Sequence, residues 1–343
     1  MPPTIVHKID DIDFARPGKH HYQLAFHLDS AWGYSLVPLT VINGTASAGP
    51  GGTGVAVFGG THGNEYEGQV AVKRLCQDLD ASQMTGRVIL MPQLSETACR
   101  AHTRRSPEDG VNMNRAFPGN ARGSLSYRIA NFVTTKVFPQ VRVVIDLHAG
   151  GMEAVFPLCT SLHPMPNQAQ SQETLTAARL FDTPFVFVYS RQMASGLLSD
   201  QAEDEGKIVI GGEFGTAEST NPTGTRHAYE GVKNVLRRYA ILPGEPVRID
   251  LQRQTPPRTV AAPILTDYIP TPADGIWEPL VAPGVDVEKD QLIGRLHDFS
   301  DHTSAPLEIR AHKSGVVIAM FFAARSVKGL TLYVLAEDAG PLD

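Results

Sequence analysis

Residues 55–68, VAVFGGTHGNEYEG, carry the strand-to-helix junction from which the rest of the chain can be placed. VAVF is typical of a short buried strand, and the glycine pair after it ends that strand. Apolar residues then recur at helical spacing over 67–79. Strands alternating with helices predict an α/β sheet covered by helices on both faces. Further strands are expected at 36–42, 88–91, 141–147, 185–189 and 207–214, and further helices from Ser124 and through 229–239.

The composition narrows the class of protein. Of the 343 residues, 42% are hydrophobic and 19% are charged, and the net charge is −6. A chain without a basic cluster is a poor partner for nucleic acid, which requires a surface that neutralises phosphates. No apolar window is long enough to span a membrane, and the N-terminus lacks the apolar core of a signal peptide. Three cysteines without pairing spacing indicate reduced thiols and predict a cytoplasmic protein.

The pattern changes after residue 242. Residues 246–265 are rich in proline without periodicity, so we interpret them as a linker. Short β-type runs follow, separated by Gly, Pro and Asp turns, and they predict a small all-β domain over 266–343 with strands at 275–280, 291–296, 314–320 and 330–336. The α/β domain is then expected over 1–245. Its first 45 residues are assigned to strands at the sheet or its edge.

Two motifs at predicted strand ends carry the residues of a metal site. His62 and Glu65 lie three apart at the turn entering the first helix, so both side chains can point to one side. His148, in DLHAGG, ends the most apolar strand of the chain. Two histidines and one glutamate are the ligands of a catalytic zinc with an open fourth position. Asp146, two residues before His148, can orient that imidazole by accepting a hydrogen bond.

Other polar residues sit where substrate would be expected. Glu213, in GGEFG, ends another buried strand and suits a general base that takes a proton from water. The segment 103–119, TRRSPEDGVNMNRAFPG, is predicted to be a loop. Guanidinium and amide groups there can bind a carboxylate. These groups belong to Arg104, Arg105, Asn112, Asn114 and Arg115.

Each of these residues alone also has an ordinary structural explanation. A single His-x-x-Glu is more often surface or core than ligand, and an arginine on a loop is usually in a salt bridge. The coincidence of three such groups at three glycine-flanked strand ends favours a hydrolytic metal site. Histidines without ligand spacing, His163 among them, are interpreted as ordinary core or surface residues.

Together, GGTHGNEYEG, NMNRAFPG, DLHAGG and GGEFG resemble the succinylglutamate desuccinylase/aspartoacylase family. These are zinc enzymes related to metallocarboxypeptidases, so the resemblance implies a three-layer α/β/α domain with a mixed sheet. It also implies one zinc ion per subunit on His62, Glu65 and His148. Glu213 would then be the base. For the rest of the site, the resemblance implies that Arg104 polarises the scissile carbonyl and that Asn114 and Arg115, with Asn112 in the same loop, bind the α-carboxylate.

One departure from the family pattern leaves a choice open. Arg105 stands beside Arg104 where an apolar residue is expected, so either arginine could face the metal. The C-terminal stretch APGVDVEKDQLIGRL resembles a biotinyl/lipoyl-type barrel without the lysine hairpin that carries a prosthetic group. We therefore interpret that domain as a structural module.

Within the family, DSAWG (29–33) and the 103–119 loop most resemble the N-acetyl-L-2,4-diaminobutyrate deacetylases of ectoine degradation. The expected reaction converts Nα-acetyl-L-2,4-diaminobutyrate and water into L-2,4-diaminobutyrate and acetate. The rivals are a deacylase for another N-acyl amino acid, a metallocarboxypeptidase, or a binding protein that keeps only the fold. Iron, manganese and cobalt also accept such ligands. The acyl group and the oligomeric state, including a homo-oligomer, are left open. The contact with the distal amine is expected from a polar or acidic residue of the β-domain or of 190–206, with no choice among them.

Overall fold

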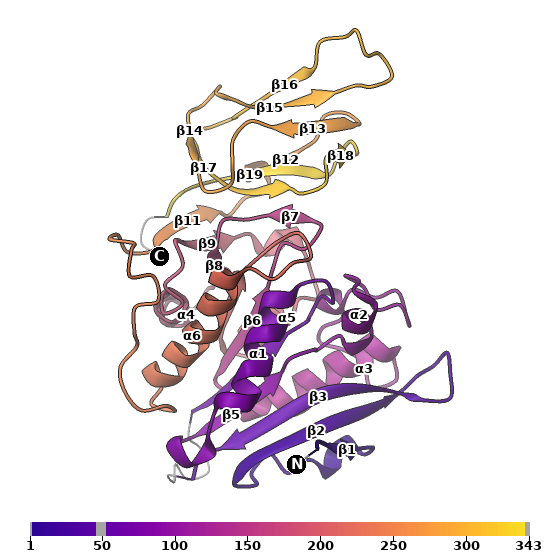
Figure 1. Ribbon diagram of the computed structural model, residues 1–343, viewed down its shortest axis with the longest axis vertical. Coiled ribbons are helices and arrows are strands. Elements are labelled where there is room, and N and C mark those ends of the chain that lie inside the picture. Colours follow the sequence, from indigo (N-terminus) through magenta and orange to yellow (C-terminus); the bar gives the residue numbers. More distant parts are fainter. Residues whose placement is uncertain (1, 46–52, 340–343) are drawn as a thin grey trace.

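The computed structural model describes residues 2–45 and 53–339. Its described strands belong to a large mixed sheet and to a separate four-stranded sheet. Figure 1 shows a lower part in which helices surround the sheet and an upper part built of strands. The predicted α/β region followed by a β-rich C-terminal region is therefore confirmed at this level.

Four neighbouring parallel strands form the centre of the large sheet. Across the sheet their order is β5 (Arg87–Met91), β4 (Gly54–Gly59), β6 (Val143–His148) and β10 (Ile208–Glu213). Because helices cover both faces, these strands are short, continuous apolar runs. Strands predicted at these positions are confirmed. Their carboxyl ends lie at one edge of the sheet, so the residues that follow them come together.

The N-terminal strands extend the sheet beyond β5. They are β1 (Thr4–Val6), β2 (Gly18–His27) and β3 (Tyr34–Asn43), and β3 lies antiparallel between β2 and β5. The predicted strand at 36–42 is therefore confirmed as part of the sheet. The bounds of β2 were not predicted, because buried and less buried residues alternate only in the second half of that strand.

The opposite side of the sheet leads into the C-terminal region. β8 (Cys159–Leu162) runs antiparallel to β10, and β9 (Phe185–Tyr189) runs parallel to β8. β11 (Arg258–Ala262) pairs with β9 and then with the C-terminal strand β19 (Thr331–Asp338). The segment 246–265, interpreted as a linker, therefore contains a strand. Its flanking prolines concealed it, and the predicted boundaries of the two domains stay a prediction.

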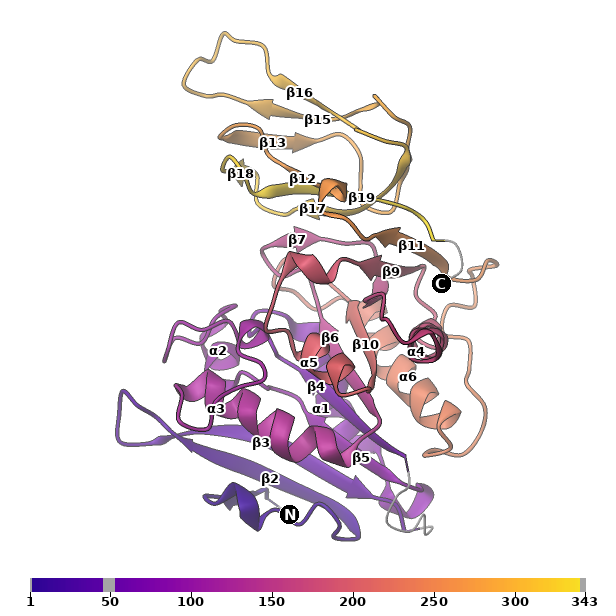
Figure 2. The same cartoon turned by 180° about the vertical axis from the view of Figure 1, so that it is seen from behind.

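Helices form a layer on each face of the sheet (Figures 1 and 2). Residues of β4 show the division, since Val55 and Val57 belong to one core cluster and Ala56 and Phe58 to the other. This alternation follows from the period of two along a strand. The first cluster contains side chains from α1 (Tyr66–Asp78), α4 (Gln168–Arg179) and α6 (Pro222–Arg238). The second contains side chains from α3 (Leu125–Phe132), a π-helix (Val133–Val137) and α5 (Leu198–Asp204). A short helix, α2 (Glu96–Ala101), lies beside β3.

Two sheets make up most of the C-terminal region and enclose a core of their own, which includes Trp277 and Leu335. β19 pairs with β12 and β17 in the large sheet, and the four-stranded sheet has the order β16-β15-β13-β18. The predicted strands at 275–280, 291–296, 314–320 and 330–336 are confirmed as β13, β15, β17 and β19. The bounds are β12 (Tyr268–Pro270), β13 (Gly275–Pro279), β14 (Asp286–Val287), β15 (Leu292–His297), β16 (Leu307–Arg310), β17 (Gly315–Phe321) and β18 (Arg325–Ser326), and β7 (Ala154–Val155) pairs with β17.

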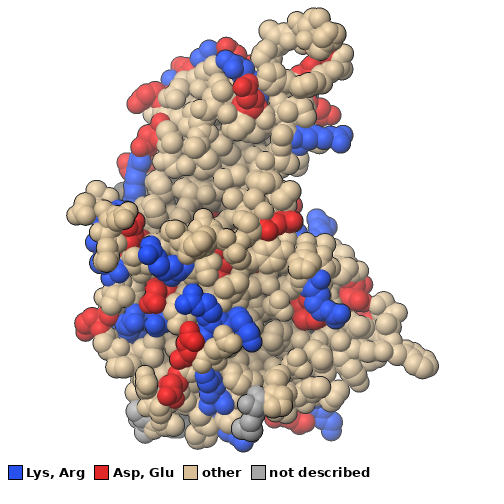
Figure 3. Space-filling model, viewed as in Figure 1, with Lys and Arg blue, Asp and Glu red and all other residues tan. Residues whose placement is uncertain are grey.

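Among the described residues, no helix combines the length and the apolar character needed to cross a bilayer. All three cysteines are buried and free. Basic and acidic side chains stand side by side over the face shown in Figure 3.

Candidate active site

The turn between β4 and α1 positions the first two candidate ligands. Gly60 takes a left-handed conformation (φ +66°) directly after the strand. Gly63 is needed for a different reason, because a Cβ there would lie 2.1 Å from the backbone of Ala98. Glu65 is the N-cap residue of α1, and its Oε1 lies 2.7 Å from His62 Nδ1. Both residues are only 3% exposed.

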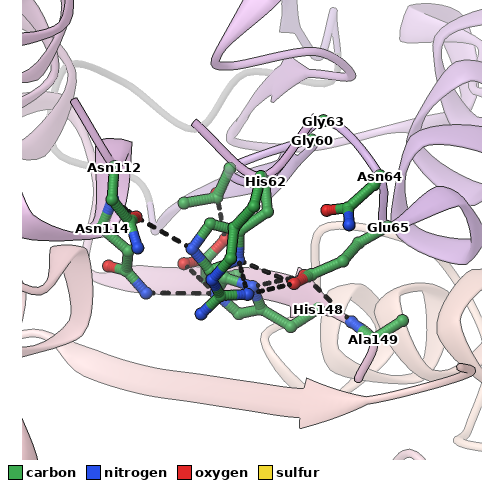
Figure 4. Close-up of polar contacts among 12 residues, drawn as sticks. Gly60, His62, Gly63, Asn64, Glu65, Asn112, Asn114, His148 and Ala149 are labelled. Atoms are coloured by element: carbon green, nitrogen blue, oxygen red, sulfur yellow. Dashed lines mark hydrogen bonds and ion pairs between the residues drawn. The ribbon is translucent and has the colours of Figure 1, made fainter. Parts of the chain in front are cut away.

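β6 brings the third candidate ligand to the same point. His148 Nδ1 lies 2.9 Å from the second oxygen of Glu65, and the Ala149 N–H donates to that oxygen at 3.1 Å. One ligand atom from each of His62, Glu65 and His148 lies within 4.8 Å of the others. Figure 4 shows both imidazoles converging on the carboxylate. The structure thus brings the three predicted ligands together from two strand ends.

In both imidazoles the outer nitrogen, Nε2, faces away from Glu65 and lies within hydrogen-bond distance of an oxygen acceptor. His148 Nε2 lies 2.8 Å from Asp146 Oδ2, and His62 Nε2 lies 3.0 Å from Asn112 Oδ1. Thr61 donates to the other oxygen of Asp146 at 2.7 Å. With protons on the outer nitrogens, the Nδ1 lone pairs point toward Glu65. This donor set, two oriented imidazoles and a carboxylate, fits a divalent metal ion.

The imidazoles beside Glu65 favour its ionised form. Burial alone would raise its pKa, but the imidazoles of His62 and His148 hold the pKa of Glu65 well below its ordinary value. For His148, burial opposes the charged form, yet the carboxylates of Asp146 and Glu65 raise its pKa well above the ordinary value. Both shifts have the same cause, the attraction between these imidazoles and the carboxylates buried beside them.

Glu213 lies at the end of β10, where it is the register partner of His148. Its Oε2 is buried and accepts no hydrogen bond from the described part of the chain. Burial, together with the charge of Glu65, raises the pKa of Glu213 to about 8. A divalent cation among the neighbouring ligands would favour the ionised form. The carboxylate is therefore available to exchange a proton inside the cavity.

The two neighbouring arginines of the 103–119 loop are not equivalent. Arg104 Nη1 donates to Glu65 Oε1 at 3.1 Å and lies 3.3 Å from His62 Nδ1. Arg104 lines the cavity at the candidate metal centre, whereas Arg105 is exposed and lies outside that lining. Of the two, Arg104 is the residue that faces the site.

The amides of the same loop have separate positions. Asn114 lines the cavity, its Nδ2 is 3.4 Å from His148 Nε2, and its Oδ1 accepts from the Leu198 N–H at 2.8 Å. Arg115 also lines the cavity. Asn112 lies behind His62 and outside the cavity lining, so its geometry favours support of a ligand over contact with substrate. The substrate roles of these residues stay predictions.

These residues open onto one cavity of about 320 Å³. Part of its wall comes from residues that the sequence analysis did not single out. The C-terminal region contributes Tyr268, Ala319 and Val334, β9 contributes Tyr189, and α5 contributes Ser199 and Glu203. No local motif marks them, because strand pairing and helix packing bring them in from distant segments.

His163, interpreted as an ordinary residue, lies in a second polar cluster with Asp200 and Glu203. His163 Nδ1 is 2.9 Å from Glu203 Oε2 and 3.6 Å from Asp200 Oδ1. The only signal in the sequence was the pair of acids three apart on α5, which is common on solvated helix faces.

The comparisons with known proteins agree on one family. A family model described as the succinylglutamate desuccinylase/aspartoacylase catalytic domain matches residues 51–239. The N-alpha-acetyl-L-2,4-diaminobutyric acid deacetylase of Halomonas elongata is 34% identical over 331 residues, covering 95% of this chain and 94% of that protein.

Solved structures extend the agreement to the whole fold. A succinylglutamate desuccinylase/aspartoacylase from Rhodobacter sphaeroides has a TM-score of 0.89 and 30% identity, covering 96% of this chain and 98% of that chain. Product-bound EutE (DoeB), an ectoine utilization protein from Ruegeria pomeroyi, has a TM-score of 0.86 and 28% identity, covering 95% and 97%. The chain therefore belongs to the succinylglutamate desuccinylase/aspartoacylase family of amide-hydrolysing enzymes.

Proposed function

We propose that this enzyme is a zinc-dependent deacetylase that converts Nα-acetyl-L-2,4-diaminobutyrate and water into L-2,4-diaminobutyrate and acetate. The observation that carries the proposal is a cavity that contains an oriented His-Glu-His set, two arginines, and Glu213, whose buried Oε2 has no hydrogen-bond partner among the described residues. The name of the Halomonas relative supports the choice of substrate. The ectoine utilization protein EutE supports a place in ectoine degradation.

His62, Glu65 and His148 would hold the zinc ion, with Asp146 and Asn112 fixing the two imidazoles. Zinc bound there would act as a Lewis acid on the acyl carbonyl and make a water molecule acidic near neutral pH. The other steps belong to side chains of the chain itself.

Glu213 takes a proton from the attacking water and returns it to the leaving amine, a role that requires its ionised form at the start. Its buried Oε2 has no competing donor in the described part of the chain, so it is free to accept that proton. Arg104 directs N–H groups into the centre, where they stabilise the oxyanion that forms on the acyl group. Asn114 and Arg115 bind the α-carboxylate from the cavity wall.

Release of acetate tests the proposal. Protein purified with zinc should release acetate and free amine from Nα-acetyl-L-2,4-diaminobutyrate. The matched control is Glu213→Gln, which preserves size and removes the base, and its rate should fall by about 100- to 10,000-fold. Turnover no greater than that of the control would refute the assignment. Faster turnover of N-succinylglutamate or N-acetylaspartate would favour the second candidate, a deacylase for another acyl amino acid, and release of C-terminal residues from a peptide would favour a carboxypeptidase.

The remaining expectations are part of the same proposal. The two facing C-terminal sheets support a barrel of the biotinyl/lipoyl type that serves as a wall of the cavity. Three buried, unpaired cysteines support a location in the reducing cytoplasm.

A further inference from the structure

The cavity is also lined by a buried carboxylate that the proposed reaction does not use. This is Glu203, on α5, whose side chain is 2% exposed. Ser199 and Tyr189 line the cavity as well, and the centroid of the Tyr189 ring lies 4.0 Å from that of the His163 ring. His163 Nδ1 lies 3.2 and 2.9 Å from the two oxygens of Glu203, so its N–H can hold the carboxylate in place. A carboxylate so deeply buried requires partners for its charge.

The groups around Glu203 leave that charge only partly compensated. Among the described residues, Arg191 is the permanent cation within ion-pair distance of Asp200, Glu203 and Asp204. The guanidinium hydrogen-bonds Asp204 at 2.9 Å, but its Nε is 3.9 Å from Glu203. Arg115 interacts electrostatically with Asp200. The Glu203 carboxylate receives its hydrogen bonds from His163 and from no permanent cation of the described residues. In the part of the chain that the structure describes, Asp200 Oδ1 is also buried without a hydrogen bond.

The same cavity also carries groups of the opposite sign. Arg104 and Arg115 line it, and each is a permanent cation. A ligand that matches this cavity therefore carries both a carboxylate and a cation. An acylated amino acid with an ammonium group on its side chain has this distribution of charge.

We propose that Glu203 binds the side-chain ammonium of the substrate, with Tyr189 and Ser199 forming the wall beside it. This inference rests on the proposed function and specifies its substrate class, Nα-acyl diamino acids. Glu203 contributes affinity through a charge-assisted hydrogen bond. It also excludes acidic side chains, since N-acetylaspartate would place a second carboxylate against Glu203 away from water.

The test compares two substrates of nearly equal shape, Nα-acetyl-L-2,4-diaminobutyrate and Nα-acetyl-L-norvaline, which has a methyl group in place of the ammonium. The wild-type enzyme should prefer the ammonium substrate by about 10- to 100-fold in kcat/KM. In Glu203→Gln this preference should fall to about one, mainly through a higher KM for the ammonium substrate. Glu205→Gln, the same change on an exposed residue just after α5, should keep the wild-type ratio.

Two results would overturn the assignment of Glu203. They are an unchanged substrate ratio in Glu203→Gln, whether or not both rates fall, and a wild-type preference for the norvaline or aspartate derivative. The last result also decides the question if Glu203→Gln does not fold.

Failure of the proposed function would be recognised separately. If wild-type protein hydrolyses no acyl amino acid, calorimetric binding of L-2,4-diaminobutyrate and L-norvaline tests the subsite alone. Tighter binding of the diamino acid by wild type, lost in Glu203→Gln, supports the subsite, and equal binding of the two amino acids refutes it.

Discussion

Replacing Asp146 should weaken zinc binding in two steps, because its carboxylate gives His148 both a hydrogen-bond acceptor and a negative charge. Asp146 Oδ2 lies 2.8 Å from His148 Nε2, and the side chain is buried. In Asp146→Asn the amide oxygen can still accept from Nε2, while the amide N–H donates to Thr61. That variant retains the geometry and loses only the charge. Asp146→Ala loses both, and His148 can then rotate or adopt the wrong tautomer.

Partners of metal-bound histidines contribute about 10- to 100-fold in metal affinity, which corresponds to about 1.4 to 2.7 kcal/mol. We expect Asp146→Asn near the lower end of this range and Asp146→Ala near the upper end. Competition with a chromogenic chelator measures the zinc dissociation constant of each variant. Thermal unfolding of the zinc-free proteins shows whether the fold is intact.

Thr61→Val is the matched control, because it removes the donor to the other oxygen of Asp146 and leaves the contact with His148. Its zinc affinity should stay within about threefold of wild type, a smaller loss than the one expected when Asp146, the acceptor of the His148 N–H, is replaced. A stable Asp146→Ala protein that binds zinc as tightly as wild type would show that Asp146 does not orient a metal ligand.

Two further perturbations test the loop and the fold. Arg104→Ala should lower kcat by about 100- to 1,000-fold by removing an oxyanion donor, whereas Arg105→Ala, an exposed neighbour, should leave kcat unchanged, and equal losses in steady-state assays would contradict the assignment. Asp182→Ala should reduce the free energy of unfolding by about 1 to 3 kcal/mol, because the Ile249 and Asp250 N–H groups lose their acceptor. Burial would raise the pKa of Asp182, but these N–H donors hold it below the ordinary value. The stabilisation is therefore complete above about pH 4 and disappears as the pH falls through the folded-state pKa. Urea unfolding of wild type and variant from pH 7 downward measures it, and a difference that does not shrink at acid pH would exclude this mechanism.

The central strands and the candidate metal ligands could be predicted because one physical rule connects them. Parallel strands buried on both faces are short apolar runs that end at glycine, and their carboxyl ends meet at one edge. His62, His148 and Glu213 all follow such runs. The rule requires no knowledge of distant contacts, so periodicity alone was sufficient.

The features that were missed depend on contacts between distant segments. β11 lies between prolines in a stretch without alternation, and only its pairing with β9 and β19 makes it a strand. Tyr268 reaches the cavity because that pairing brings the C-terminal sheet against the α/β region. Glu203 and His163 are forty residues apart and meet across the packing of α5 against the sheet. No local pattern specifies these meetings.

The positions of these groups separate chemistry from substrate choice. The candidate metal ligands and Glu213 lie at the ends of β4, β6 and β10, where strand register holds them rigidly. Glu203 lies on α5, and the Leu198 N–H at the start of that helix donates to Asn114 in the 103–119 loop. Because the metal ligands belong to other elements, side chains on α5 can change without moving a metal ligand. We expect α5, with Asn114 and Arg115 of this loop, to determine which amino acid is accepted. The strand ends, with Arg104, determine that an amide bond is hydrolysed.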